Sequence, residues 1–89
     1  MIAPVMPVYR RSPITMVKGE GCYLFDDANK RYLDFATGIA VNALGHCHPH
    51  VTQALKTQAD QLWHCSNMYQ SSALERMAAR LVENTFADS

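Results

Sequence analysis

The chain is organised around residues 32–49, which read YLDFATGIAVNALGHCHP. The stretch begins as a strand, since Tyr32, Leu33 and Phe35 are large residues that favour β-structure. Small residues follow at 36–38, where we expect a tight bend or a close approach of the backbone to another group. The stretch ends in a glycine, two histidines and Pro49, and a helical pattern starts there. A strand that passes through small residues into a helix start is typical of a cleft wall.

The composition of the 89 residues limits the classes of protein to consider. Apolar residues make up 48% and charged residues 18%, which excludes a disordered chain. Eight acidic residues balance eight basic ones, so the charge gives no sign of nucleic acid or an anionic membrane as a partner. No apolar run approaches the roughly 20 residues of a membrane helix. Three cysteines, without the spacing of a disulfide framework, favour reduced thiols in a cytoplasm.

Residues 1–13 are expected to form an irregular arm, because Pro4, Pro7 and Pro13 each oppose helix formation. Tyr9 stands in this arm beside two arginines. The arm either packs on a neighbouring surface or faces a substrate, since tyrosine and arginine suit the recognition of a carboxylate.

Three short strands are predicted at residues 14–18, 22–26 and 31–35, with turns at 19–21 and 27–30. Two glycines provide the first turn, and an Asp-Ala-Asn-Lys sequence provides the second, so the last two strands are expected to form a β-hairpin. Asp26 and Asp34 lie in or beside these strands. We interpret both carboxylates as turn or cap acceptors and not as catalytic acids.

Two amphipathic helices are predicted beyond Pro49, a residue that suits the first helical turn. The first covers residues 49–64, and Asn67 tolerates the left-handed conformation that stops a helix. The second covers residues 73–84, opens with a capping box of Ser72 and Glu75, and places Met77 on its apolar core stripe. Three antiparallel strands and two helices make a small α+β unit. Large apolar residues on both hairpin faces indicate that more protein covers them.

Histidines and cysteines gather at His46, Cys47, His48 and His50, and again at His64 and Cys65. A structural zinc site is one interpretation, because imidazole and thiolate are zinc ligands. The other is that His46 and His48 cap the following helix and bond to nearby backbone. The spacing favours the second interpretation, since the sequence has no Cys-x-x-Cys pair. No nucleophile motif and no phosphate-binding glycine loop is present.

Several segments taken together resemble the N-terminal part of the class III aminotransferases, which are pyridoxal-phosphate enzymes of the α/β fold type I. The segments are GEGCYLFD at 19–26, YLDFATGIAV at 32–41 and LGHCHP at 44–49. Residues 62–64, 66–69 and 85–88 are similar to the acetylornithine and succinylornithine aminotransferase branch. The resemblance extends over the chain from Val8 onward.

The resemblance implies that this chain is an N-terminal fragment, an α+β piece of short antiparallel strands followed by two helices. Residues 1–13 would be an N-terminal arm, and residues 14–48 the β-segment and channel-lining loop of the small domain. Residues 49–89 would be two helices that lead toward an absent large cofactor-binding domain. Lys18, Lys30 and Lys56 match no cofactor lysine, so no catalytic, cofactor-binding or metal-binding residue is assigned, and the fragment alone should be inactive.

Substrate contacts are implied by the same resemblance for four residues, Tyr9, Thr37, Gly38 and Ile39. Related ornithine aminotransferases carry a tyrosine at the position of Ile39, and an aliphatic side chain there suits an N-acylated substrate better than free ornithine. Asn67 and Tyr69 match a segment at a dimer interface, near the partner's active site.

The full enzyme is therefore expected to be a cytoplasmic homodimer of arginine metabolism. It would move an amino group between N-acetylornithine, succinylornithine or ornithine and 2-oxoglutarate, with pyridoxal 5'-phosphate bound by regions missing from this chain. Neither nucleic acid nor a membrane is expected as a partner. Two further interpretations stay open, namely a non-catalytic small domain for interaction or dimerisation, and a His/Cys metal-binding module.

Overall fold

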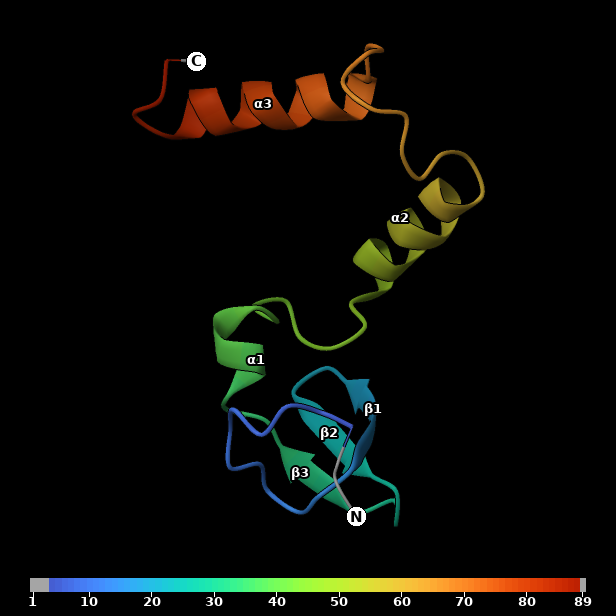
Figure 1. Cartoon of the computed structure of the whole chain (residues 1–89), viewed down its shortest axis with the longest axis vertical. Helices are drawn as coiled ribbons and strands as arrows, with labels where there is room; N and C mark the ends of the chain where they lie inside the picture. Colours follow the sequence, from blue (N-terminus) through green and yellow to red (C-terminus); the bar gives the residue numbers. More distant parts are fainter. Residues whose placement is uncertain (1–3, 89) are drawn as a thin grey trace. The chain divides into compact units, whose positions relative to one another are not determined.

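The computed structural model describes residues 4–88. Residues up to Lys56 belong to one compact unit, and residues from Thr57 onward belong to a second. The first unit contains three strands, a short helical turn and the start of a longer helix, whereas the second contains the end of that helix and one more. Figure 1 shows these elements in chain order. Residues 1–3 of the predicted arm at 1–13 lie outside the described residues. Residue 89, the last of the predicted helical segment at 49–89, also lies outside them.

The first unit is built on an antiparallel sheet with the strand order β1-β2-β3 (Figure 1). The strands are β1 (Met16–Glu20), β2 (Tyr23–Asp26) and β3 (Arg31–Leu33). Each strand pairs with its neighbour in sequence, so two short hairpins make the sheet. The predicted hairpin of the last two strands and the α+β character of the segment are confirmed.

The first strand and the first turn differ from the sequence prediction. The glycines predict a turn at 19–21, whereas Gly19 pairs with Leu24 inside the sheet and only Gly21 and Cys22 connect the strands. Gly21 has a φ of +56°, which a residue without a side chain adopts easily. Gly19 serves another purpose, because a Cβ placed there would lie 2.7 Å from Cγ of the His46 ring. The strand glycine therefore marks a close contact and not a bend.

Asp26 organises the turn between β2 and β3. Its Oδ1 accepts hydrogen bonds from the backbone N–H groups of Ala28 (3.0 Å) and Lys30 (2.8 Å), and its Oδ2 accepts from the Tyr32 hydroxyl (2.9 Å). Asn29 in the turn has a φ of +60°. The bond from the Lys30 backbone is the largest cause that lowers the pKa of Asp26, with smaller contributions from Tyr32 and Ala28. The predicted role of Asp26 as a turn acceptor is confirmed.

A short helical turn, α1 (Thr37–Ala40), stands where the sequence predicts a loop. All four of its residues have a positive φ, between 51° and 64°. Backbone hydrogen bonds nevertheless close the turn, with Ile39 N–H donating to the Ala36 carbonyl (2.8 Å) and Asn42 N–H to the Thr37 carbonyl (2.9 Å). The segment is therefore a left-handed turn, a conformation that L-residues rarely hold over several positions.

The first long helix, α2 (Pro49–Ala59), begins at Pro49 as predicted but ends at Ala59 instead of 64. Two side chains near this end donate hydrogen bonds to backbone carbonyls that would accept backbone N–H groups if the helix continued. Trp63 Nε1–H donates to the Ala59 carbonyl, and Gln58 Nε2–H donates to the Leu62 carbonyl, each at 2.8 Å. The left-handed residue in the following connection is Ser66, with a φ of +67°, so the prediction that Asn67 takes this role is wrong.

The second long helix, α3 (Ser72–Asn84), is capped by a different serine from the one predicted. Ser71 has an extended backbone, and its hydroxyl accepts a hydrogen bond from the Leu74 N–H at 3.5 Å. Ser72 is the first helical residue. The predicted capping box of Ser72 and Glu75 is therefore wrong, because Ser71 is the cap and the residue three positions after it is Leu74, whose side chain cannot bond back to the Ser71 N–H.

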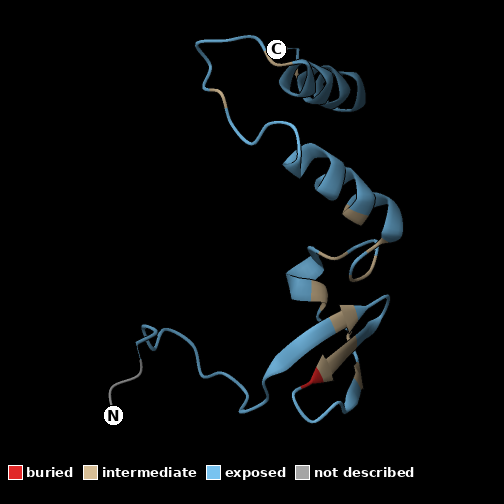
Figure 2. Cartoon of the chain, turned by 90° about the vertical axis from the view of Figure 1, so that its right-hand side faces the viewer, coloured by how far each residue is buried: buried red, intermediate tan, exposed pale blue. Residues whose placement is uncertain are grey.

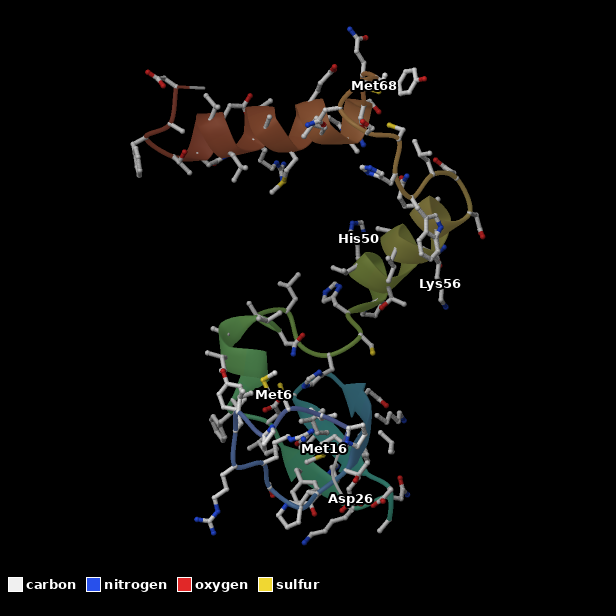
Figure 3. All side chains as sticks on the ribbon, viewed as in Figure 1. Met6, Met16, Asp26, His50, Lys56 and Met68 are labelled. Atoms are coloured by element: carbon white, nitrogen blue, oxygen red, sulfur yellow. The ribbon has the colours of Figure 1, made fainter. Side chains whose placement is uncertain are left out.

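No apolar side chain among residues 4–88 is buried. The buried residue of this part is Asp26, at 8% exposure, which Figure 2 colours red. Met77, which the helical pattern predicts in a core stripe, is 56% exposed, so this prediction is wrong for the segment. Figure 3 shows the side chains of α3 projecting from the helix in several directions. Such apolar surface is available for contact with protein beyond these residues.

Candidate functional site

Asp34, just after β3, holds the start of the left-handed turn. Its Oδ1 accepts hydrogen bonds from the backbone N–H groups of Ala36 (3.1 Å) and Thr37 (3.0 Å). The Thr37 hydroxyl in turn accepts from the Ala40 N–H at 3.1 Å. Asp34 Oδ1 and the Thr37 hydroxyl oxygen therefore accept the backbone N–H groups that lie just before α1 and within it. The predicted role of Asp34 as a cap acceptor is confirmed.

His46 completes the environment of this carboxylate. Its Nε2 lies 2.6 Å from Asp34 Oδ2, and the two side chains are 17% and 6% exposed. The hydrogen bond with His46 is the largest cause that lowers the pKa of Asp34, followed by the bond from the Thr37 backbone. An ionised carboxylate only accepts hydrogen bonds, so His46 Nε2–H is the donor. The pair is a short, charge-assisted contact beneath the turn.

Three glycines allow the His46 segment to lie against the sheet. His46 N–H donates to the Gly21 carbonyl (2.8 Å) and Gly21 N–H donates to the His46 carbonyl (3.1 Å). A Cβ at Gly45, whose φ is +84°, would lie 3.0 Å from the Gly21 carbonyl oxygen. The His46 ring lies on Gly19, as described for β1. A side chain at Gly19 would therefore collide with the His46 ring, and one at Gly45 would press on the Gly21 backbone, whereas a Cβ at Gly21 would meet no other atom within 4 Å.

We refer to Asp34, His46 and α1 together as the turn site. A hollow of about 130 Å³ beside it is lined by Gly21, Cys22, Asp34, Thr37, Asn42, Ala43, Gly45 and His46. Ile39 projects from the turn and is 92% exposed. The strained backbone thus presents an apolar side chain outward, while the polar groups that hold it lie behind. Backbone strain of this kind is concentrated at functional sites and costs on the order of 1–3 kcal/mol per residue.

The substrate-contact residues expected from the sequence are only partly brought together. Thr37, Gly38 and Ile39 are consecutive residues of α1. Tyr9 lies in the arm before β1 and is 82% exposed, and no hydrogen bond in the described residues joins it to the turn site. The contact between Asp34 and His46 was not predicted from the sequence. A glycine inside a strand was the available signal, because it marks a close approach by another group.

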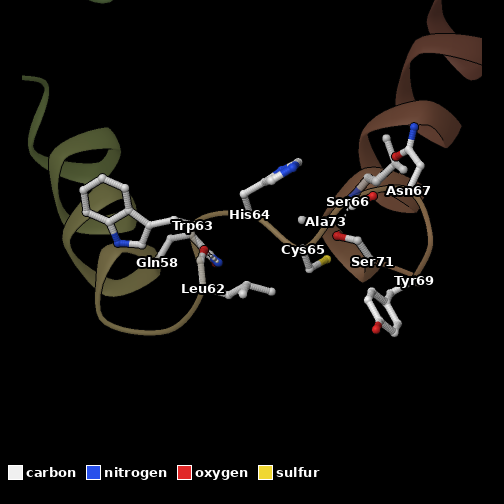
Figure 4. A pocket seen from close by; sticks show the side chains of 11 residues that line it. Gln58, Leu62, Trp63, His64, Cys65, Ser66, Asn67, Tyr69, Ser71 and Ala73 are labelled. Atoms are coloured by element: carbon white, nitrogen blue, oxygen red, sulfur yellow. Dashed lines mark hydrogen bonds between the residues drawn. The ribbon is translucent and has the colours of Figure 1, made fainter.

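Asn67 and Tyr69 lie in the second unit, in the connection between α2 and α3. They line a hollow of about 350 Å³ whose other walls come from the end of α2, the connection and the start of α3. Figure 4 shows the Cys65 thiol and the Tyr69 ring on one side of the connection and the His64 ring on the other. The side chains of Asn67 and Tyr69, the two residues expected at an interface, thus line the same exposed hollow.

Two of the three lysines of the segment make contacts on the sheet. Lys18 pairs with Glu20 at 3.1 Å and lies over the Phe25 ring, and Lys30 lies over the Tyr32 ring. Neither Lys nor Arg lines the hollow beside the turn site or the hollow at the connection between α2 and α3. Neither hollow therefore offers an amine for a Schiff base or a cation for a phosphate group, so these hollows do not fit pyridoxal phosphate by themselves.

Two of the four histidines use their rings in hydrogen bonds within this segment. His48 Nδ1 accepts from the His50 N–H at 3.3 Å at the start of α2, so the predicted cap is confirmed for His48. For His46 it is wrong, because its ring bonds to Asp34. Within residues 4–88, no group of three His, Cys, Asp or Glu side chains is arranged to hold a metal ion. In the same part of the chain, no helix is long and apolar enough to cross a membrane.

Residues 5–89 match the aminotransferase class-III family. The chain belongs to this family. The acetylornithine aminotransferase of Agrobacterium fabrum is 51% identical to this class-III aminotransferase segment over 86 residues, which are 97% of the segment and 22% of the relative. The segment spans about a fifth of the length of the curated relatives that it matches.

Two solved structures resemble the class-III aminotransferase segment closely. The N-acetylornithine aminotransferase from Stenotrophomonas maltophilia has a TM-score of 0.79 and 36% identity over 82% of the segment and 20% of that chain. The acetylornithine aminotransferase from Elizabethkingia anophelis has a TM-score of 0.82 and 28% identity over 88% of the segment and 20% of that chain. The predicted family is confirmed, and the segment corresponds to a short part of these longer aminotransferases.

Proposed function

We propose that this segment forms a wall of the substrate channel in an aminotransferase that moves an amino group between N-acetylornithine and 2-oxoglutarate. The observation that carries the proposal is 51% identity to an acetylornithine aminotransferase over 97% of the segment. The strained turn at residues 37–40 supports it, because such a backbone persists where a surface is shaped for a ligand. In this proposal residues 14–48 are the β-segment and channel loop of the small domain, preceded by the arm 1–13 and followed by the helices of 49–89.

Ile39 is the residue that we assign to recognition of the acylated end of the substrate. An apolar side chain offers no partner to a free ammonium group, and burying that group without a partner is unfavourable. A neutral N-acyl group avoids this desolvation and gains apolar contact with Ile39. Thr37 and Gly38 set the backbone that presents Ile39, and Tyr9 contributes a hydroxyl from the arm.

Other parts of the enzyme complete the active site in this proposal. Enzymes of the class-III family depend on pyridoxal phosphate, which we assign to residues outside this segment because its own lysines do not fit the cofactor. We also propose a cytoplasmic homodimer, in which Asn67 and Tyr69 lie near the partner's active site. Cys22, Cys47 and Cys65 are free thiols, as a reducing compartment allows.

The test is a kinetic comparison of amino donors with the complete enzyme and 2-oxoglutarate as acceptor. N-acetylornithine should have the highest kcat/KM, succinylornithine should be accepted, and ornithine should be the poorest donor. Replacing Ile39→Tyr should lower kcat/KM for N-acetylornithine, whereas the matched Ile39→Leu variant should stay near wild type. A preference for ornithine would overturn the substrate assignment. A complete enzyme without transamination of any donor would favour the interaction-domain interpretation.

A further inference from the structure

We infer that Asp34 and His46 are positioning residues that set donor selectivity by holding the left-handed turn against the sheet. The inference rests on the proposed function of α1 as a substrate-facing wall. It gives a role in donor selectivity to two residues for which the family resemblance implied no substrate contact. Neither side chain is assigned a contact with the substrate, because both lie behind the turn, at 17% exposure for His46 and 6% for Asp34.

The first step is that the turn needs an external support. Its four successive residues all have a positive φ, and three of them carry side chains. This left-handed conformation is unfavourable for residues with a side chain. The carboxylate of Asp34 supplies that support by accepting the N–H groups of Ala36 and Thr37 at 3.1 and 3.0 Å. With these two bonds lost, a more relaxed backbone would compete with the left-handed turn, and Ile39 would change its position.

The second step is that the carboxylate itself is oriented by His46. Oδ1 faces the turn and Oδ2 faces His46 Nε2 at 2.6 Å, so the two oxygens have separate tasks. Rotation of the carboxylate would break both sets of bonds at once. His46 therefore acts on the turn through Asp34, and the two substitutions should not have additive effects.

The third step is that the sheet fixes His46. The two backbone bonds with Gly21 hold its main chain, and the bare backbone of Gly19 provides the surface on which its ring lies. The turn is therefore joined to β1 and β2 through a chain of contacts from Gly19 through His46 and Asp34 to Thr37, in addition to the bond that the Asp34 N–H donates to the Cys22 carbonyl (2.8 Å). A substitution that breaks any one of these contacts should therefore change donor selectivity in the same direction.

The experiment uses the complete enzyme with its cofactor bound and compares Asp34→Ala, Asp34→Asn and His46→Ala. The measured quantity is the ratio of kcat/KM for N-acetylornithine to kcat/KM for ornithine. We expect Asp34→Ala and His46→Ala each to lower this ratio roughly tenfold, the size of effect that a shifted apolar contact produces. The double variant should be no worse than either single one. Asp34→Asn should retain part of the ratio, because its amide oxygen still accepts from Ala36 and Thr37. Asp27→Asn, an exposed aspartate at the β2–β3 turn, is the matched control and should match wild type.

A second measurement, hydrogen exchange of residues 35–42, does not depend on activity. Exchange there should become faster in Asp34→Ala and His46→Ala but not in Asp27→Asn. Lower thermal stability with an unchanged donor ratio and unchanged exchange would overturn the inference, because the pair would then be merely structural. If wild-type enzyme fails to use N-acetylornithine, the proposed function fails. Exchange alone then decides whether the pair holds the turn.

Discussion

Asp26 and Asp34 perform the same task in two different turns. Each accepts two backbone N–H groups through Oδ1 and one side-chain donor through Oδ2, from Tyr32 and from His46 respectively. The local half of this pattern is predictable from sequence, since aspartate beside a turn commonly bonds to the backbone a few residues on. The other half is not, because the distant donor depends on how the hairpin and the loop before α2 come together. Both acceptors were therefore predictable from the sequence, whereas the Asp34–His46 pair was not.

Asp26 should make the stability of the enzyme depend on pH in the acidic range. Its pKa lies below the ordinary value of 3.8 in the folded protein, chiefly because the Lys30 N–H bonds to the carboxylate. A lowered folded pKa stabilises the fold above the unfolded pKa, and this stability disappears as the pH falls through the folded value. We expect Asp26→Asn to lower the thermal midpoint by a constant amount from pH 5 to 8, with the difference closing below about pH 4.

Thermal melts of wild type and Asp26→Asn across this pH range check the expectation. Comparing the difference between the two proteins removes the contribution of all other carboxylates. Asp27→Asn is the control for loss of charge at the same turn. A gap that widens on acidification would show that the sign is wrong.

Gly38→Val should damage catalysis more than folding. Gly38 has a φ of +64°, and an added Cβ would lie 3.2 Å from the Asn42 side-chain nitrogen. A β-branched residue is strained at this φ and would tilt the turn that carries Ile39. We expect kcat/KM for N-acetylornithine to fall roughly tenfold to a hundredfold, as strain of a few kcal/mol implies. Gly38→Ala, with less bulk, should fall between this variant and wild type. Wild-type kinetics in Gly38→Val would remove α1 from the channel wall.

At the scale of elements, the types of structure were predictable and several boundaries were not. Alternation and turn residues located the hairpin, and apolar spacing located both long helices, because these signals are local. The start of β1, the end of α2 and the cap of α3 depend on contacts that spacing does not reveal, such as His46 on Gly19 or Trp63 on the Ala59 carbonyl. α1 was unpredictable for a stronger reason, since Thr37, Ile39 and Ala40 have no preference for a positive φ.

The cap of α3 can be tested with the two adjacent serines. Ser71→Ala removes the hydroxyl that accepts from the Leu74 N–H and should cost about 1 kcal/mol of helix stability. Ser72→Ala should be neutral or slightly stabilising, because alanine is a better residue inside the first turn. Circular dichroism of synthetic peptides spanning residues 68–88 measures both effects. The reverse ranking would restore the capping box at Ser72.

At the scale of the whole molecule, the segment has apolar surface without an apolar core. No apolar residue of 4–88 is buried, while Phe35, Trp63 and Phe86 are among the exposed large side chains. Uncovered apolar patches and open strand edges both drive association between chains. We therefore expect the isolated 89-residue chain to associate and to bind a hydrophobic dye, instead of behaving as a compact monomer.

Size-exclusion chromatography with light scattering is the direct measurement of this behaviour. The same preparation should show no transaminase activity and form no internal aldimine with added pyridoxal phosphate. A sharp monomeric peak with a cooperative melt would mean that residues 1–89 are a self-sufficient domain. The interpretation that other protein covers these faces would then be wrong.

The order of strands in the sheet has a consequence for biosynthesis. Each of the strands β1, β2 and β3 pairs only with its neighbour in sequence. His46, which bonds to both Gly21 and Asp34, follows shortly afterwards in the chain. Short loops close quickly and at small entropic cost, so every one of these pairings can form once position 46 has left the ribosome. The nascent chain would then carry the complete β1-β2-β3 sheet, with α1 already held in the left-handed form. The apolar faces of this sheet would stay exposed until later segments are synthesised. Exposed apolar surface and unpaired strand edges of this kind make a growing chain prone to aggregation.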